Sequence, residues 1–186
     1  AAVRTAGGGR CPFSERCQPA WFCPHARRCF VCDAHACAAC RFERGAADGA
    51  AALAARLRPA LVALDFDRTL ATTRSGGAPE VGRHRVDDDL LTLMWEHEGH
   101  CEIVTRNRHT DAIRAFLTAH GAPDAARLPI HHVAKGATKA AVVLAALAAR
   151  GGGEAMLVDD SIAELAEPSL AAAATVHRFL FVRALL

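Results

Sequence analysis

Two pairs of aspartates are the residues in this chain best suited to carry out chemistry. Asp65 and Asp67 follow one short apolar run, and Asp159 and Asp160 follow another. Carboxylate pairs brought together repel one another unless a hard cation lies between them, and Mg²⁺ is a cation that takes oxygen ligands. The two pairs therefore predict a Mg²⁺ site, in preference to two solvated acidic loops.

A hydroxyl and an ammonium group occupy comparable positions in the sequence. Thr105 ends another apolar run, and Lys139 opens a stretch rich in alanine, leucine and valine that is typical of a helix. A hydroxyl, an ammonium group and a helix N-terminus together are suited to hold a phosphoryl group. Thr105 also fits as a plain strand-end hydroxyl, and Lys135 competes with Lys139 for the role of the cation. We favour Lys139 because it opens the apolar helix that precedes the second aspartate pair.

The elements that must position these residues follow from the apolar pattern. Strands are expected over 61–64, 101–105, 128–133, 155–158 and 176–182. Helices are expected over 50–57, 86–97, 110–120, 139–150 and 162–172. Strands that alternate with helices predict right-handed crossovers and a three-layer α/β domain, with a parallel sheet covered on both faces. Ligands bind at the carboxyl ends of the strands in such a sheet, which is where the aspartates are expected.

These residues resemble, in chain order, the four motifs of the haloacid dehalogenase superfamily of phosphotransferases. The motifs are a D-x-D-x-T at 65–69, the strand-end Thr105, Lys139, and the pair Asp159 and Asp160. The resemblance covers about residues 60–186 and is closest to the small Mg²⁺-dependent and capless phosphatases of that group. It implies a Rossmann-like fold without a cap and the activity of a phosphomonoester hydrolase.

The resemblance also implies a role for each residue. Asp65 is then the nucleophile that forms an aspartyl-phosphate, and Asp67 gives a proton to the leaving group and takes one from the attacking water. Thr105 and Lys139 hold the phosphoryl oxygens. The implied Mg²⁺ ligands are Asp65, Asp67 through its backbone carbonyl, Asp159 and Asp160 as its neighbour. The alternative is a catalytically idle scaffold that keeps the same fold inside a larger assembly.

The intervals between the motifs leave no room for a lid. Asp65 and Thr105 lie 40 residues apart, and Thr105 and Lys139 lie 34 residues apart. Both intervals already contain expected elements, whereas an independent folding unit needs about 60 residues. An open site cannot exclude water by closing, which favours a bulky substrate or one presented by a partner. We therefore expect a phosphorylated protein or a polynucleotide end as the substrate.

The cysteines are concentrated near the beginning of the chain. Seven of the eight lie between residues 11 and 40, and the eighth, Cys101, falls in an apolar stretch and is expected in the core. Seven cysteines in close pairs, together with one histidine, supply enough ligands for two tetrahedral zinc ions, which we favour over a disulfide knot or free thiols. The candidate ligands are Cys11, Cys17, Cys23, His25, Cys29, Cys32, His35, Cys37 and Cys40, with either His25 or His35 as the eighth ligand.

Part of this segment resembles a B-box zinc finger. The similar stretch is Trp21-Phe-Cys-Pro-His25, followed by Cys29-Phe-Val-Cys32-Asp33 and His35. The spacing from Cys11 to Cys17 and the final pair of cysteines depart from that family, so its ligand pairing is not carried over. We prefer a cross-brace, in which alternate pairs share an ion. Because the segment has few apolar residues, metal would supply most of its folding free energy, and contact with a protein partner is its expected role.

Length and composition set the class of the protein. The 186 residues suffice for one mid-sized domain with a small appendage. The expected divisions are a flexible N-terminus at 1–10, a zinc-binding module at 11–42, a linker with a short helix at 43–59, and the phosphatase domain at 60–186. A net charge of +2 does not by itself identify a polyanionic partner. A phosphatase that processes nucleic-acid ends stays open as an alternative.

Location is predicted from the same sequence features. No apolar run reaches the ~18 residues needed to cross a bilayer, so no membrane partner is expected. Reduced thiols that bind metal favour an intracellular compartment, without separating cytoplasm, nucleus and organelle matrix.

Overall fold

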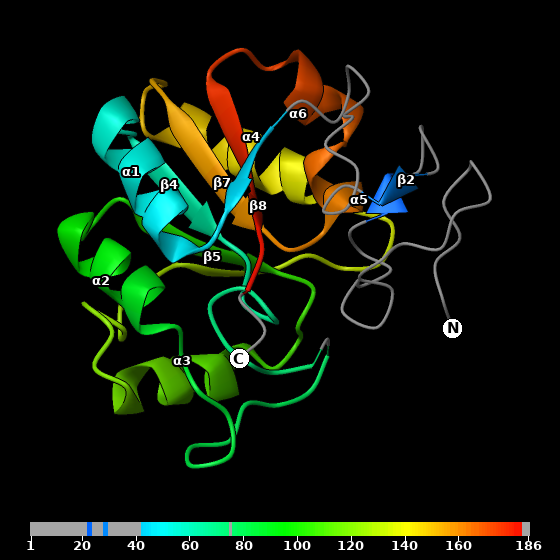
Figure 1. Ribbon diagram of the computed structural model, residues 1–186. Helices are drawn as coiled ribbons and strands as arrows, with labels where there is room; N and C mark the ends of the chain where they lie inside the picture. The colour runs from blue at the N-terminus through cyan, green and yellow to red at the C-terminus, as the bar shows by residue number, and fades with distance from the viewer. Residues whose placement is uncertain (1–21, 24–27, 30–41, 75, 184–186) are drawn as a thin grey trace.

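A parallel sheet of six strands organises the described part of the chain (Figure 1). The structure is a computed structural model that describes residues 42–74 and 76–183, and the backbone alone of 22–23 and 28–29. In order across the sheet, the strands are β3 (Glu43–Gly45), β8 (Val176–Phe181), β7 (Ala155–Asp159), β4 (Leu61–Leu64), β5 (Cys101–Thr105) and β6 (Ile130–His132). The α/β class and the parallel sheet expected from the sequence are therefore confirmed.

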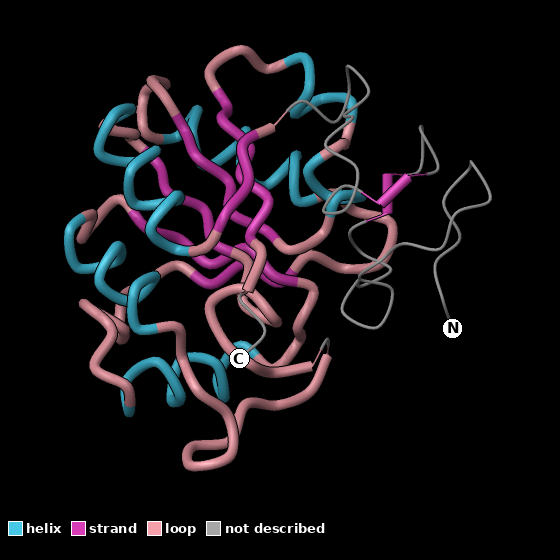
Figure 2. Tube along the Cα trace, in the orientation of Figure 1, coloured by secondary structure: helices cyan, strands magenta, loops and turns pink. Residues whose placement is uncertain are grey.

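Helices cover both faces of the sheet, which gives three layers (Figure 2). One face is covered by α1 (Ala47–Leu57), α2 (Asp88–Glu96) and α3 (Thr110–Ala119). The other is covered by α4 (Lys139–Ala149), α5 (Ile162–Leu165) and α6 (Pro168–Ala172). Strand β4 shows why the sequence pattern is continuously apolar: Leu61 and Ala63 enter one core, and Val62 and Leu64 enter the other.

The order of the strands opens a crevice at the carboxyl end of β4. After β4 the chain crosses on one face, through α2, to β5, and after β7 it crosses on the other face, through α5 and α6, to β8. Because β4 and β7 are neighbours, the loops that follow them leave the sheet toward opposite faces. This reversal is the place where ligands bind in open α/β sheets.

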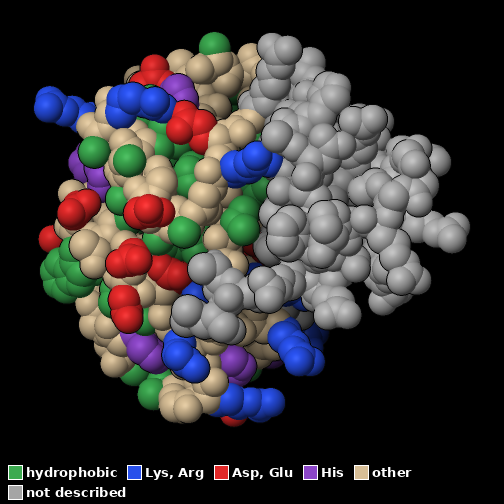
Figure 3. All heavy atoms as spheres, in the orientation of Figure 1, with side chains coloured by type: hydrophobic (Ala, Val, Ile, Leu, Met, Phe, Trp, Pro, Cys, Tyr) green, Lys and Arg blue, Asp and Glu red, His purple; other side chains and the backbone are tan. Residues whose placement is uncertain are grey.

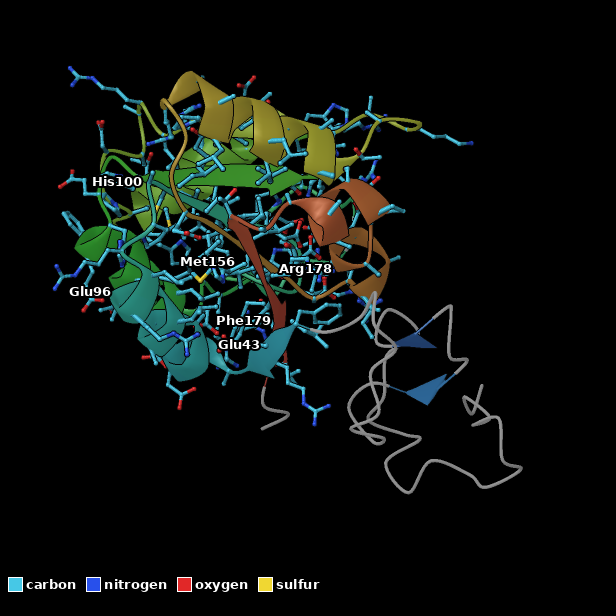
Figure 4. All side chains as sticks on the ribbon, turned by 90° about the horizontal axis from the view of Figure 1, so that it is seen from above. Glu43, Glu96, His100, Met156, Arg178 and Phe179 are labelled. Carbon is cyan, nitrogen blue, oxygen red and sulfur yellow. The ribbon has the colours of Figure 1, made fainter. Side chains whose placement is uncertain are left out.

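Strand β3 and the start of α1 differ from the linker expected at this point. Residues 43–45 pair with β8 in parallel, and α1 begins at Ala47 rather than at Ala50. A Cβ atom on Gly45 or Gly49 would lie 3.3 or 3.1 Å from the ring of Phe179, so glycine permits this close approach. Figure 4 shows Phe179 beside β3. Residues 43–45 therefore belong to the six-stranded sheet, and α1 contributes residues to the core on one of its faces.

The prediction of a single helix over 162–172 is wrong, because the chain forms two short helices there. Helix α5 ends at Leu165, and α6 begins at Pro168. Proline lacks a backbone N–H and is favoured in the first turn of a helix. The Glu167 carboxylate caps the new helix by accepting hydrogen bonds from the backbone N–H groups of Ser169 and Leu170.

The N-terminal segment is described only at two short strands. Strands β1 (Phe22–Cys23) and β2 (Arg28–Cys29) pair antiparallel and lie beside α5 (Figure 1). The side chains of the expected zinc ligands, and the expected flexible N-terminus at 1–10, lie outside the described residues. Among the helices that the structure describes, none is both long enough and apolar enough to cross a membrane.

Candidate active site at the carboxyl edge of the sheet

Three buried aspartates meet at the carboxyl ends of β4 and β7. One carboxylate oxygen from each of Asp65, Asp159 and Asp160 lies within 4.8 Å of the other two. The meeting follows from strand pairing, because Leu64 lies opposite Val158 in the two neighbouring strands and the aspartates come directly after them. The two aspartate pairs singled out in the sequence are thus brought together, with the Asp67 carboxylate outside the cluster.

Lys139 provides the cation of this cluster. Its Nζ donates to Asp65 Oδ1 at 2.5 Å and to Asp159 Oδ2 at 2.7 Å, and its side chain is buried. It is the first residue of α4, and the preceding Thr138 caps the helix by accepting a hydrogen bond from the Ala141 N–H. Lys135, the competing candidate, is exposed in the preceding loop.

The cluster contains more negative than positive groups. Burial raises the pKa of Asp65 well above its usual range, and the nearby Asp159 and Asp160 add to this while Lys139 opposes it. Burial, followed by the charge of Asp159, raises the pKa of Asp160 to about 7. Burial disfavours the ammonium form of Lys139, but Asp159 and Asp65 outweigh it and raise the pKa of Lys139. One buried ammonium group therefore faces three carboxyl groups, and the half-buried Arg68 also acts on Asp160 by lowering its pKa.

The excess of carboxylate oxygens fits a divalent cation. Asp160 Oδ2 is buried and has no hydrogen-bond partner within the described residues. A buried acceptor without a partner costs stability, and this cost is removed when a ligand completes its contacts. Hard oxygen donors from Asp65, Asp159 and Asp160 are the type of ligand that Mg²⁺ takes.

Asp67 is held in place by a separate set of donors. Its Oδ1 accepts from Thr73 Oγ1 at 2.6 Å, and its Oδ2 accepts from the Gly76 N–H at 2.9 Å. Asn107 Nδ2 lies 3.1 and 3.2 Å from the two oxygens. Sequence reasoning missed Thr73 and Gly76, which lie in a loop without periodicity. It also assigned no role to Asn107, for which the position two residues after Thr105 was the available signal.

Two threonines complete the immediate surroundings. Thr105 is fully buried and its Oγ1 accepts from the Asn107 N–H at 3.1 Å. Thr69 Oγ1 donates to Asp65 Oδ2 at 3.3 Å and accepts from the Asp160 N–H at 3.1 Å. Thr69 thus joins the loop after β4 to the loop after β7, a role that the motif at 65–69 contained but that was not assigned to it.

A small pocket connects these groups with the surface. Its volume is about 170 Å³. The residues that line it are Asp65, Asp67, Arg68, Thr105, Arg106, Lys139, Asp159, Asp160, Ser161 and Glu164. Every catalytic residue expected from the sequence therefore lines one pocket. A nucleophilic carboxylate, a second carboxyl group, a cation and a set of metal ligands in one pocket are suited to phosphoryl transfer.

Comparison of the chain with protein-family models, with curated proteins and with solved structures found no match.

Proposed function

We propose that the chain is a Mg²⁺-dependent phosphomonoester hydrolase with Asp65 as its nucleophile, of the haloacid dehalogenase type that its motifs resemble. The observation that carries the proposal is the buried trio of Asp65, Asp159 and Asp160, which shares the single ammonium group of Lys139. Such an unbalanced cluster is costly in an apolar core. Perturbed carboxyl groups of this kind are concentrated at functional sites.

The metal ligands would be Asp65, Asp159, Asp160 and the backbone carbonyl of Asp67. Bound Mg²⁺ would neutralise the excess carboxylate charge and stabilise charge on the phosphoryl oxygens. Lys139 contributes a fixed positive charge beside the nucleophile, which favours the ionised form of Asp65 and opposes the effect of its burial. Thr105, which is buried in the pocket wall, would hold a phosphoryl oxygen.

The reaction uses two carboxyl groups in turn. Asp65 attacks phosphorus, the bond to the ester oxygen breaks, and the leaving oxygen takes a proton from Asp67. Water then gives a proton to Asp67 while its oxygen attacks phosphorus. The bond between phosphorus and Asp65 breaks, which releases phosphate and restores the carboxylate. The hydrogen bonds from Thr73, Gly76 and Asn107 fix the position of the Asp67 carboxyl group at the pocket wall.

Pocket size supports a large substrate. The pocket of about 170 Å³ is smaller than the roughly 300–1,000 Å³ that whole small-molecule ligands occupy. It accommodates a phosphoryl group, and the rest of the substrate must lie outside. A macromolecular or partner-presented phosphoester meets this requirement.

The experiment is hydrolysis of p-nitrophenyl phosphate with Mg²⁺ by the wild-type chain and by Asp65→Asn. Loss of the nucleophile should lower kcat by about 10³-fold or more. Asp111→Asn is the matched control, because Asp111 is exposed in the first turn of α3 and undergoes the same chemical change. Unchanged turnover by Asp65→Asn would reject the nucleophile, and an inert wild type would favour the scaffold alternative.

We also infer that the N-terminal cysteines bind zinc, and this inference can be tested independently of the active site. Metal analysis of the purified chain should give about two zinc ions per molecule, because seven cysteines and one histidine complete two tetrahedral sites. Intact disulfides without zinc would contradict this inference.

A further inference from the structure

A second, larger hollow adjoins the active-site pocket. It has a volume of about 570 Å³ and is formed by the loops after β4, β5 and β6. We call it the basic groove, because Arg106, Arg108, Lys135 and His132 line it and none of the described residues that line it is acidic. Arg106 lines both hollows, so the groove begins where the active-site pocket ends.

The side chain of Arg106 lies between the active-site pocket and the basic groove and lines both. Its Nε donates to Glu164 Oε1 at 2.8 Å, and its Nη1 donates to the carbonyl oxygens of Ala134 and Ala137 at 3.0 and 2.9 Å. These contacts fix the loop after β6 against α5. The Arg106 guanidinium is therefore occupied in shaping the groove.

Arg108 and Lys135 are the cations that the groove offers to a ligand. Both are exposed, and neither side chain makes a hydrogen bond or ion pair with the part of the chain that the structure describes. On the face that Figure 3 shows, charge is unevenly distributed although the net charge is only +2. In Figure 3, acidic side chains gather over α1 and α2, whereas Lys and Arg side chains lie mainly along the upper and lower edges.

Position and charge together indicate a substrate with a second anionic group. A phosphoester whose phosphoryl group enters the small pocket places the rest of the molecule at Arg106 and then in the basic groove. Two exposed cations that have no ion-pair partner among the described residues attract anions, and exposed Lys and Arg are typical ligands of phosphodiesters. The volume of the groove lies within the range of a ligand-binding site.

We propose that the basic groove binds the phosphodiester next to the terminal phosphate of a nucleic-acid strand; this rests on the proposed phosphatase function. Every nucleic-acid strand carries that second phosphate, whatever its sequence, whereas a phosphopeptide carries an acid there only in particular sequences. The apolar residues that line the groove are small, Val133 and Ala137, and offer little to a peptide side chain. Among the described residues that line the groove, His132 is the only one with an aromatic ring, so the groove is suited to the backbone of a strand rather than to its bases.

The test compares substrates on the full chain with Mg²⁺. The substrates are p-nitrophenyl phosphate, thymidine monophosphates, short thymidine oligonucleotides with a 3′ or 5′ terminal phosphate, and a phosphoserine peptide with acidic neighbours. The variants are Arg108→Ala with Lys135→Ala, and Arg127→Ala as the control. Arg127 is also exposed, and its side chain has no partner among the described residues. It lies just before β6, at the amino ends of the strands, whereas the basic groove lies at their carboxyl ends.

The wild type should prefer oligonucleotides to the monophosphates, and the double variant should lower kcat/KM for oligonucleotides, relative to p-nitrophenyl phosphate, by about 10-fold or more. The slope of log KM against log salt concentration should fall by about 1 for each lost cation. The control should keep both the ratio and the slope of the wild type.

Two results would contradict the proposed role of the basic groove and leave the proposed phosphatase function unaffected. One is equal turnover of oligonucleotides and monophosphates, and the other is a phosphopeptide preference that depends on Arg108 and Lys135. Absence of any turnover, p-nitrophenyl phosphate included, would instead overturn the proposed function. In that case, fluorescence anisotropy of a labelled oligonucleotide tests binding in the basic groove separately. Weaker binding by the double variant than by the wild type supports the proposal, and equal binding rejects it.

Discussion

Helix α4 has a long basic residue at each end, and each meets buried acid in a different way. Lys139, at the start, donates to two of three clustered aspartates. Arg150, at the end, donates to Glu102 Oε1 through Nε and Nη2 at 3.2 and 2.8 Å. The other oxygen of Glu102 lies 2.7 Å from His131 Nε2.

The difference lies in the balance of charge and hydrogen bonds. Both oxygens of Glu102 have partners, and the acid faces a guanidinium group and an imidazole. At the other end three buried carboxyl groups share the ammonium group of Lys139, with Arg68 as a further positive charge near Asp160, and Asp160 Oδ2 has no hydrogen-bond partner among the described residues. A balanced buried pair has a structural explanation, whereas an excess of buried acid is explained by a ligand that compensates it. We therefore assign a structural role to the Arg150 end of α4 and a catalytic role to the Lys139 end.

The largest expected effect comes from removing the cation at the catalytic end. Lys139→Met should lower kcat for p-nitrophenyl phosphate by about 10²–10³-fold, because a fixed charge beside the nucleophile and the phosphoryl group is lost. Steady-state kinetics measures this effect. Activity near that of the wild type would remove the distinction between the two ends of the helix.

The same substitution at the other end should act on stability. Arg150→Met should lower the free energy of unfolding by about 2–4 kcal/mol, because Glu102 is left buried without its ion-pair partner and the carbonyl groups of Ala60 and Gly99 lose a donor. Urea denaturation gives this value, and kcat of the folded variant should equal that of the wild type. A loss of kcat similar to that of Lys139→Met would show that this end also serves catalysis.

A smaller effect is expected from reducing the excess charge itself. In buffer without Mg²⁺ at pH 8, Asp160→Asn should raise the free energy of unfolding by about 1–3 kcal/mol, since a buried carboxylate is replaced by a neutral group. The pKa of Asp160 is about 7 in the folded state and about 4 in the unfolded chain. The folded wild type therefore holds more protons between these values and loses stability as the pH rises through them.

The advantage of Asp160→Asn should accordingly shrink as the pH falls toward 5. Denaturation curves at the two pH values, for both proteins, measure it. A variant that is less stable than the wild type at pH 8 would show that the three carboxylates are not in excess.

The smallest effect on stability is expected at Cys101, the first residue of β5, to which we assign a structural role like that of Arg150. Cys101→Ala should cost about 1 kcal/mol of stability with no change in kcat, because the thiol is a buried core group. Burial raises the pKa of Cys101 to about 12, so the thiolate is scarce at neutral pH. Peptide mapping after treatment with iodoacetamide should therefore find Cys101 unmodified in the folded protein, and rapid modification would place it at the surface.

Much of the sheet could be predicted because its strands are short apolar runs buried on both faces. Strand β4 is the clearest example, with all four residues fully buried. Strand β3 could not be predicted, since it is three residues long, lies at the edge of the sheet and has two exposed charged residues. Its place is fixed by the fit of Gly45 and Gly49 against Phe179, which periodicity does not reveal.

The candidate site shows the same division. Asp65 and Asp159 could be placed together because parallel strands end at one edge of a sheet. The donors to Asp67 could not, because Thr73 and Gly76 reach it through a loop whose path has no sequence pattern. The balance of charge at Lys139 and at Arg150 depends on three-dimensional neighbours, so the sequence alone did not separate these two ends of α4.

The most direct test of the central claim is an anomalous-diffraction measurement on crystals of the full chain soaked with Mn²⁺, which accepts the same oxygen ligands as Mg²⁺. We expect a peak within bonding distance of the carboxylates of Asp65, Asp159 and Asp160, and none beside Glu102. Crystals without a peak among these aspartates, in which Lys139 still bridges Asp65 and Asp159, would contradict a metal site at the carboxyl edge of the sheet.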